Sequence, residues 1–143
     1  MVQIRDSIDI QAPPSEVYAA LRDLAVYPSW LTHSVVYRGT KVTASASGLS
    51  YEDSTMVGRM HGELVEDVPD HALHFHQHLS SGGLDAHIRY SLDATGTATH
   101  LTRVGDMTTK GVLHMMQPML VRMAAAESKR MMGALKARVE HHA

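Results

Sequence analysis

Hydrophobic and polar residues alternate over the first ten positions of the chain. Val2, Ile4, Ile8 and Ile10 fall on one face, and Asp6 is the polar exception on that face. Strict alternation over this length is typical of a strand with one buried face. The sequence therefore predicts an N-terminal strand over residues 2–10.

Two short helices are predicted after this strand. Ala12-Pro13-Pro14-Ser15 ends the strand, and Pro and Ser are favoured at the first positions of a helix. Glu16 follows, where the helix dipole favours an anion. The apolar stripe of this helix is Val17, Ala20, Leu21 and Leu24. Tyr27-Pro28 interrupts the pattern, and residues 29–31 predict a second helical turn that contains the single Trp, Trp30.

The middle of the chain consists of short strand-like segments separated by turn residues. We expect strands at about 34–42, 49–57, 59–68, 72–79, 84–93 and 97–108. The separating residues are Ser47-Gly48, Gly58, Pro69-Asp70, Ser81-Gly82-Gly83 and Ala94-Thr95-Gly96. Because the turns are short, neighbouring strands should pair in antiparallel fashion.

The last element is predicted to be one long amphipathic helix from Val112 to about Glu140. Pro118 lies early in it and marks either a kink or the true first turn. The apolar positions recur near helical spacing: Met116, Met119, Leu120, Met123, Met131, Ala134, Leu135 and Val139.

This order of elements predicts an α+β fold. A seven-stranded antiparallel sheet is wide enough to curl. A helix of about 25 residues spans roughly 38 Å, which is comparable to the width of such a sheet. A straight helix and a curled sheet cannot touch along their whole length, so we expect a gap between them.

The sequence resembles the START-domain-like (SRPBCC) superfamily. The similarity is carried by IDIQAPPSEVYAALRDLAVYPSWL at residues 8–31, by Gly62 and Pro69, by Gly96-Thr97 and by the closing helix. The resemblance covers the whole chain and implies one START-like ligand-binding domain over residues 1–143. It implies the helix-grip fold, in which a curled sheet wraps around a long C-terminal helix. The small bacterial cyclase/dehydrase-like branch is the most similar, and ligands and activities differ widely within the superfamily.

Composition narrows the classes of partner. The chain has 143 residues and a formal charge of −2, so it offers no electrostatic reason to expect nucleic acid. No apolar run approaches the ~20 residues of a membrane span, and acids occupy the N-terminal segment where a signal peptide is apolar. We therefore expect a cytoplasmic protein. The absence of Cys excludes disulfides, thiolate ligands and a Cys nucleophile.

The inward faces of the strands and of the last helix are the candidate walls of a cavity. Alternation alone does not distinguish a cavity from a solid core, and the resemblance favours the cavity. By the same resemblance Trp30 lies near the mouth, although it could equally be a core residue. The candidate ligand-binding residues are Trp30, Tyr51, Met60, Leu64, Leu73, Phe75, Gln77, Ile88, Tyr90, Met116, Met119, Leu120 and Met123.

Histidines alternate along the segment 72–79. His74, His76 and His78 share one face, and His-x-His on a strand can bind a metal ion. That face is opposite to Leu73, Phe75 and Leu79, and His61 and His87 have the same outward parity. We therefore expect a solvated, proton-sensitive patch, and we predict neither a metal site nor a cofactor.

Buried polar side chains would indicate catalysis. The candidates are Asp6, Tyr37, Tyr51, Asp53, Gln77, Tyr90 and Arg103. The weak catalytic candidates among them are Arg103, Tyr51 and Gln77. Arg103 shares parity with Leu101 and Met107, so an unbroken strand would bury it and require a partner such as Asp6 or Asp53. A one-residue slip or a bulge at Gly105 would instead expose it, and this is the arrangement we favour.

Three functions remain open at this point. The first is a carrier or sensor that binds a polyketide-, isoprenoid- or lipid-like molecule in the cavity. The second is a polyketide cyclase, aromatase or dehydratase that acts in the same cavity and needs inward polar groups. The third is an interaction protein, such as a homodimer, in which the cavity is incidental. Convergence of Arg103, Tyr51 and Gln77 inside a pocket would favour the enzyme.

Overall fold

The computed structural model describes residues 1–23, 27–31, 37–45 and 48–141. Its helices and strands follow the predicted order, and the α+β class is confirmed. The elements are β1 (Val2–Ile10), α1 (Pro14–Arg22), α2 (Tyr27–Trp30), β2 (Tyr37–Ser45), β3 (Gly48–Thr55), β4 (Gly58–Val68), β5 (Ala72–Leu79), β6 (Leu84–Thr95), β7 (Ala98–Thr109), α3 (Val112–Met115) and α4 (Gln117–His141).

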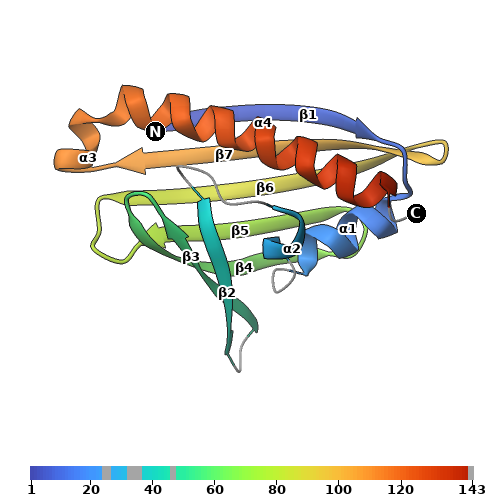
Figure 1. The fold of residues 1–143 in the computed structure, drawn as a ribbon, viewed down its shortest axis with the longest axis horizontal. Helices are drawn as coiled ribbons and strands as arrows, with labels where there is room; N and C mark the ends of the chain where they lie inside the picture. The colour runs from blue at the N-terminus through green and yellow to red at the C-terminus, as the bar shows by residue number, and fades with distance from the viewer. Residues whose placement is uncertain (24–26, 32–36, 46–47, 142–143) are drawn as a thin grey trace.

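The seven strands form one antiparallel sheet in the order β1-β7-β6-β5-β4-β3-β2. Among the described strands of this sheet, β1 and β7 are the one neighbouring pair that is not consecutive in sequence. Figure 1 shows β2 and β3 turning away from the direction of the other strands, while α4 crosses one face of the sheet. This curled sheet closed by a long C-terminal helix confirms the predicted helix-grip fold.

The start of the helical C-terminal region differs from the prediction of one continuous helix. The turn α3 ends at Met115, and α4 begins at Gln117. Pro118 therefore lies in the first turn of α4, where its missing N–H costs no intrahelical hydrogen bond. Of the two roles open for Pro118, the structure selects the first turn over a kink.

The helix α1 is fixed on the sheet by its apolar side and by its C-terminal end. Val17 and Leu21 are fully buried. The Tyr27 hydroxyl donates a 2.6 Å hydrogen bond to the Leu21 carbonyl oxygen, which is one of the carbonyls that a helix end leaves without an intrahelical partner. This hydrogen bond anchors α2 on the C-terminal end of α1.

A residue that follows a bulge in β4 contacts helix α1. The pairing of β4 with β5 shifts between Leu64 and Glu66, which leaves one extra residue in β4. Bulges bend a strand and redirect the side chains beyond them. Beyond the bulge, the Asp67 carboxylate accepts hydrogen bonds from the Tyr18 hydroxyl and from Arg22 Nε, the latter at 3.1 Å.

The most deeply buried side chains lie where α1 and the C-terminal half of α4 meet the sheet. The fully buried Ile10, Leu21, Leu73, Leu101 and Leu135 belong to this core. Figure 1 shows α1 close to the C-terminal end of α4 and α3 at the opposite end of the sheet. The core therefore fills one end of the space between sheet and helix and leaves the other end to a cavity.

Candidate ligand cavity

A cavity of about 250 Å³ lies between the concave face of the sheet and the N-terminal half of α4. Its walls are mostly apolar, and α4 contributes Leu120, Met123, Ala124 and Met131. The end of β3 and the turn into β4 contribute Thr55, Met56 and Val57. The gap expected from the mismatch of a straight helix and a curled sheet is therefore present.

Eight of the predicted ligand-binding residues line this cavity and five do not. Those in the wall are Tyr51, Met60, Phe75, Gln77, Ile88, Tyr90, Leu120 and Met123. Trp30, Leu64, Leu73 and Met116 lie outside the wall, as does Met119, whose side chain is 44% exposed. Leu73 faces inward as its parity predicts, but it packs in the core rather than in the cavity.

Several wall residues are not among the predicted ligand contacts. Ile4 and Met107 could have been found, because they alternate in phase with Ile8 and Leu101 on paired strands. The others outside that set include Tyr27, Leu31, Asp53, Leu84, Ala86 and Glu127. No sequence signal placed the β3–β4 turn in the wall, since that position follows from the curl of the sheet.

Arg103 lines the cavity, so the favoured prediction of an exposed Arg103 is wrong. The pairing of β6 with β7 runs without a shift from Leu84 opposite Thr109 to Thr95 opposite Ala98. Gly105 therefore causes no slip, and Arg103 keeps the inward parity of Leu101 and Met107. Its side chain is half-buried.

The guanidinium of Arg103 is held by an aromatic side chain rather than by an acid. Arg103 Nε donates a 3.2 Å hydrogen bond to the Tyr90 hydroxyl, and its Cζ lies 5.8 Å from the centre of the Tyr90 ring. The Tyr90 hydroxyl donates in turn to Met131 Sδ at 3.6 Å. Within the described residues, neither Asp6 nor Asp53 forms the predicted ion pair with Arg103.

A second polar group in the wall joins Tyr51 and Gln77. Gln77 Nε2 donates a 2.5 Å hydrogen bond to the Tyr51 hydroxyl oxygen. Burial, reinforced by the nearby Asp53 carboxylate, raises the pKa of Tyr51 well above its usual value. The Tyr51 hydroxyl is therefore neutral and can act as a hydrogen-bond donor toward the cavity.

Asp53 is an acidic group of the cavity wall. Its Oδ1 accepts a 2.7 Å hydrogen bond from the Thr40 hydroxyl. Burial raises the pKa of Asp53 from 3.8 to about 6, and the Thr40 hydrogen bond opposes part of that change. A carboxyl group with this pKa exchanges its proton near neutral pH, which is the property of a general acid or base.

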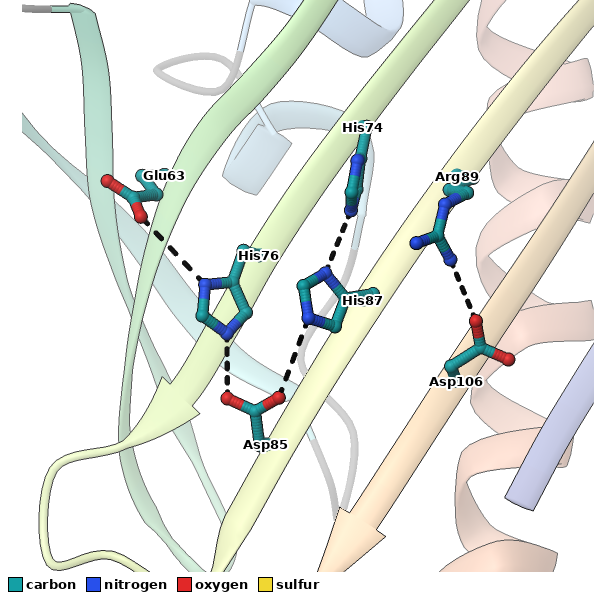
Figure 2. Close-up of polar contacts among 7 residues, drawn as sticks. All are labelled: Glu63, His74, His76, Asp85, His87, Arg89 and Asp106. Atoms are coloured by element: carbon teal, nitrogen blue, oxygen red, sulfur yellow. Dashed lines mark hydrogen bonds and ion pairs between the residues drawn. The ribbon is translucent and has the colours of Figure 1, made fainter. Parts of the chain in front are cut away.

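The histidines of β5 lie on the opposite face of the sheet, as their parity predicted. Figure 2 shows His74 and His76 of β5 beside His87 of β6, in front of the sheet, with α4 behind it. The rings of His76 and His87 stack at a centroid distance of 4.3 Å. These side chains therefore contribute nothing to the cavity.

In the part of the chain that the structure describes, none of the helices combines the length and the apolarity needed to cross a membrane.

The polar candidate Tyr37 begins β2, and its side chain lies outside the described set.

Solved structures share this fold at low sequence identity. The Zhui aromatase/cyclase from Streptomyces sp. R1128 superposes with a TM-score of 0.83 at 12% identity, over 97% of this chain and 93% of that one. The protein TTHA0849 from Thermus thermophilus gives a TM-score of 0.78 at 15% identity, over 96% and 97% of the two chains. A START superfamily protein from Mycobacterium smegmatis gives a TM-score of 0.76 at 16% identity, over 99% of each.

At the level of sequence, no curated protein matches the chain. The family described as polyketide cyclase/dehydrase and lipid transport matches residues 1–140. A match of that extent, together with the curled sheet and its C-terminal helix, shows that this chain belongs to the polyketide cyclase/dehydrase and lipid transport family.

Proposed function

We propose that this protein binds a compact hydrophobic molecule that carries a carbonyl or carboxylate oxygen, and that the Arg103 guanidinium holds this oxygen. The observation that carries the proposal is a cation in a largely apolar cavity wall that forms no ion pair with any residue the structure describes. Arg103 uses its Nε on Tyr90, and no other hydrogen bond of its guanidinium is present among the described residues. Its remaining N–H donors are the natural partners of an electron-rich oxygen.

The size of the cavity bears on the class of ligand. Ligand pockets in proteins measure about 300–1,000 Å³, and the volume here, about 250 Å³, lies just below this range. A molecule of one or two rings suits this volume better than a long acyl chain. The Met side chains in the wall, Met60, Met107, Met123 and Met131 among them, can adapt to a flat ligand.

Displacement of an uncharged fluorescent dye such as Nile red, which has no anionic group for Arg103 to hold, tests the proposal. Matched pairs of compounds, naphthalene against 2-acetylnaphthalene or 2-naphthoate, differ only in the oxygen-bearing group. The wild type should bind the oxygenated member more tightly. Arg103→Met should remove that preference and leave the binding of naphthalene unchanged. No displacement by any compound, or an unchanged preference in Arg103→Met, would contradict the proposal.

A second function, cyclisation or dehydration of a polyketide-like substrate, is supported by the presence of an acid, Asp53, and a cation, Arg103, in one wall. Asp53 would take a proton from the carbon between two carbonyl groups. The electron pair would move onto a carbonyl oxygen held by Arg103, and the resulting enolate carbon would attack a second carbonyl of the same molecule. The π electrons of that carbonyl would move onto its oxygen, which would take the proton back from Asp53. Loss of this hydroxyl with a hydrogen of the neighbouring carbon, as water, would give the unsaturated ring. Such chemistry needs a base with a pKa near the working pH, as Asp53 has.

The enzymatic function is tested with a thioester that carries several β-ketone groups. Wild-type protein should accelerate ring closure, followed by the absorbance of the aromatic product. Its rate should rise with pH through about pH 6, where Asp53 loses its proton. Asp53→Asn should abolish the acceleration while dye binding persists. An Asp53→Asn variant with wild-type rates would exclude Asp53 as the base.

A further inference from the structure

The outer face of the sheet carries a cluster of side chains that the cavity does not use. His76 of β5 and Asp85 and His87 of β6 each offer one donor atom, and these atoms all lie within 4.8 Å of one another. His76 Nε2 lies 2.7 Å from Asp85 Oδ1, and His87 Nε2 lies 3.7 Å from Asp85 Oδ2. Figure 2 shows both imidazole rings directed at the same carboxylate.

We propose that His76, His87 and Asp85 form a binding site for a zinc ion, with water completing the coordination. Two imidazole nitrogens and one carboxylate oxygen form a donor set that suits Zn²⁺. Tetrahedral Zn²⁺ with bonds of about 2.0–2.1 Å places its ligand atoms roughly 3.3 Å apart. The donor atoms lie within 4.8 Å of one another, and the 2.7 Å and 3.7 Å distances run to the two different oxygens of Asp85. Because the rings of His76 and His87 are stacked 5° from parallel, they must tilt toward each other before both Nε2 lone pairs point at one ion.

The second nitrogen of each imidazole also has a suitable neighbour. Histidines that bind metals usually donate their other ring N–H to a carboxylate or another acceptor, which fixes the ring orientation. His76 Nδ1 faces Glu63 Oε1 at 3.8 Å. His87 Nδ1 lies 2.9 Å from His74 Nε2. Both candidate ligands thus have an outer partner that leaves Nε2 free to bind the ion.

Charge and exposure are compatible with an ion at this place. The carboxylates of Asp85 and Glu63 flank the two imidazoles and would compensate the charge of Zn²⁺. The Arg89 guanidinium on the same face is bound to the Asp106 carboxylate at 2.7 Å, which reduces its repulsion of a cation. The side chains of His76 and His87 are 27% and 36% exposed, so an ion can reach them from solvent.

The donor set differs from the one that the sequence spacing suggested. The His-x-His pattern pointed to neighbours along β5, whereas the structure joins one of those histidines to two residues of β6. The register of β5 with β6 places His76 directly opposite His87. A bound ion would therefore link the two strands of the β5–β6 hairpin.

Isothermal titration of the full chain with ZnCl₂, after removal of metal by EDTA and without an affinity tag, tests the site. One ion should bind per chain. His76→Ala, His87→Ala and Asp85→Asn should each weaken binding at least about tenfold, since even outer partners of a metal site contribute that much. Glu63→Gln should weaken it by a smaller factor. Wild-type protein that binds no zinc, or variants that bind it unchanged, would overturn the proposal.

Two controls separate this site from other histidines. The first control is His100, whose Nδ1 lies 2.7 Å from Asp9 Oδ1. This pair consists of one imidazole and one carboxylate, whereas the proposed site has two imidazoles. His100→Ala should therefore bind zinc as the wild type does. Replacement of His141 and His142 by Ala should also leave binding unchanged; loss of binding there would assign the ion to the C-terminus and reject the site. Cobalt(II) added to wild-type protein should give visible absorption bands that His76→Ala lacks.

Discussion

The aromatic ring of Tyr51 packs directly on the backbone of Gly62, its cross-strand neighbour. The two residues are paired in the register of β3 with β4. A Cβ built at Gly62 would lie 2.6 Å from both Cε atoms of the Tyr51 ring, closer than real contacts allow. Only glycine at this position allows Tyr51 to lie flat against the sheet and reach Gln77.

Gly62→Ala should therefore destabilise the protein and displace Tyr51 from the wall. Overpacking of a buried site costs about 1–3 kcal/mol, and we expect that loss in the free energy of unfolding by urea. Gly133→Ala is the matched control, because a Cβ there meets nothing within 4 Å and the position is an exposed one in α4. It should stabilise the protein by about 0.5–1 kcal/mol. Equal stability changes in the two variants would contradict the packing argument.

The two methionines Met119 and Met123 of α4 should differ sharply in their effect on ligand uptake. Met123 lines the cavity, whereas Met119 is 44% exposed and does not. Met123→Asp places an unpaired carboxylate in the apolar wall and should abolish dye binding. Met119→Asp, although the helical spacing predicts a wall position there, should leave dye binding unchanged. The comparison is made by fluorescence titration of ANS, and equal losses in the two variants would reject the assignment of the wall.

The elevated pKa of Asp53 gives stability a defined dependence on pH. In the folded protein the pKa is about 6, compared with 3.8 for the free side chain, so the folded state binds more protons in this range. The contribution of Asp53 to stability is greatest below about pH 4 and is lost as the pH rises through about 6.

Asp53→Asn removes this dependence, because the amide stays neutral and can still accept the Thr40 hydrogen bond. Wild type and variant should therefore approach one another in stability at low pH, and the variant should be the more stable at pH 7. Urea unfolding at pH 4.5, 5.5 and 7 measures the difference between them, in which the titration of the histidines cancels. A difference that does not change with pH would show that Asp53 does not titrate in this window.

The buried hydroxyl of Thr99 ties the end of β1 to β7. It donates a 2.8 Å hydrogen bond to the Ala12 carbonyl oxygen, and both residues are buried. Thr99→Val keeps the shape but leaves that carbonyl without its partner, which should cost about 1–3 kcal/mol of unfolding free energy. Thr97→Val, at an exposed position of the adjoining turn, should change stability by no more than about 0.5 kcal/mol. A similar cost at both positions would show that the loss does not come from the hydrogen bond to Ala12.

The fold could be predicted because its signals are local. Alternation along 2–10 and 72–79, the Pro13-Pro14 helix start and the glycine-containing turns each follow from the conformational limits of a few residues. The orientation of Arg103 could not be predicted from local signals, because Gly105, two positions away, permits a bulge without requiring one. Only the observed register of β6 with β7 decides it.

The cavity wall was predicted in part for a related reason. Alternation determines which face of a strand a residue occupies, but it says nothing of what covers that face. Leu73 and Phe75 share a face of β5, yet Leu73 packs in the core and Phe75 lines the cavity. The difference depends on where α1 ends and how α4 crosses the sheet, which are properties of the assembled fold.

Because side chains alternate along β5, the residues that line the cavity and the residues on the outer face of the sheet are set by one register. Phe75 and Gln77 face the cavity, and His76 between them faces solvent beside His87. Insertion or deletion of a single residue ahead of Phe75 would move imidazoles into the apolar interior and carry an aromatic ring outside. This stretch of chain can therefore change by substitution during evolution, but a change in its length would alter both surfaces at once.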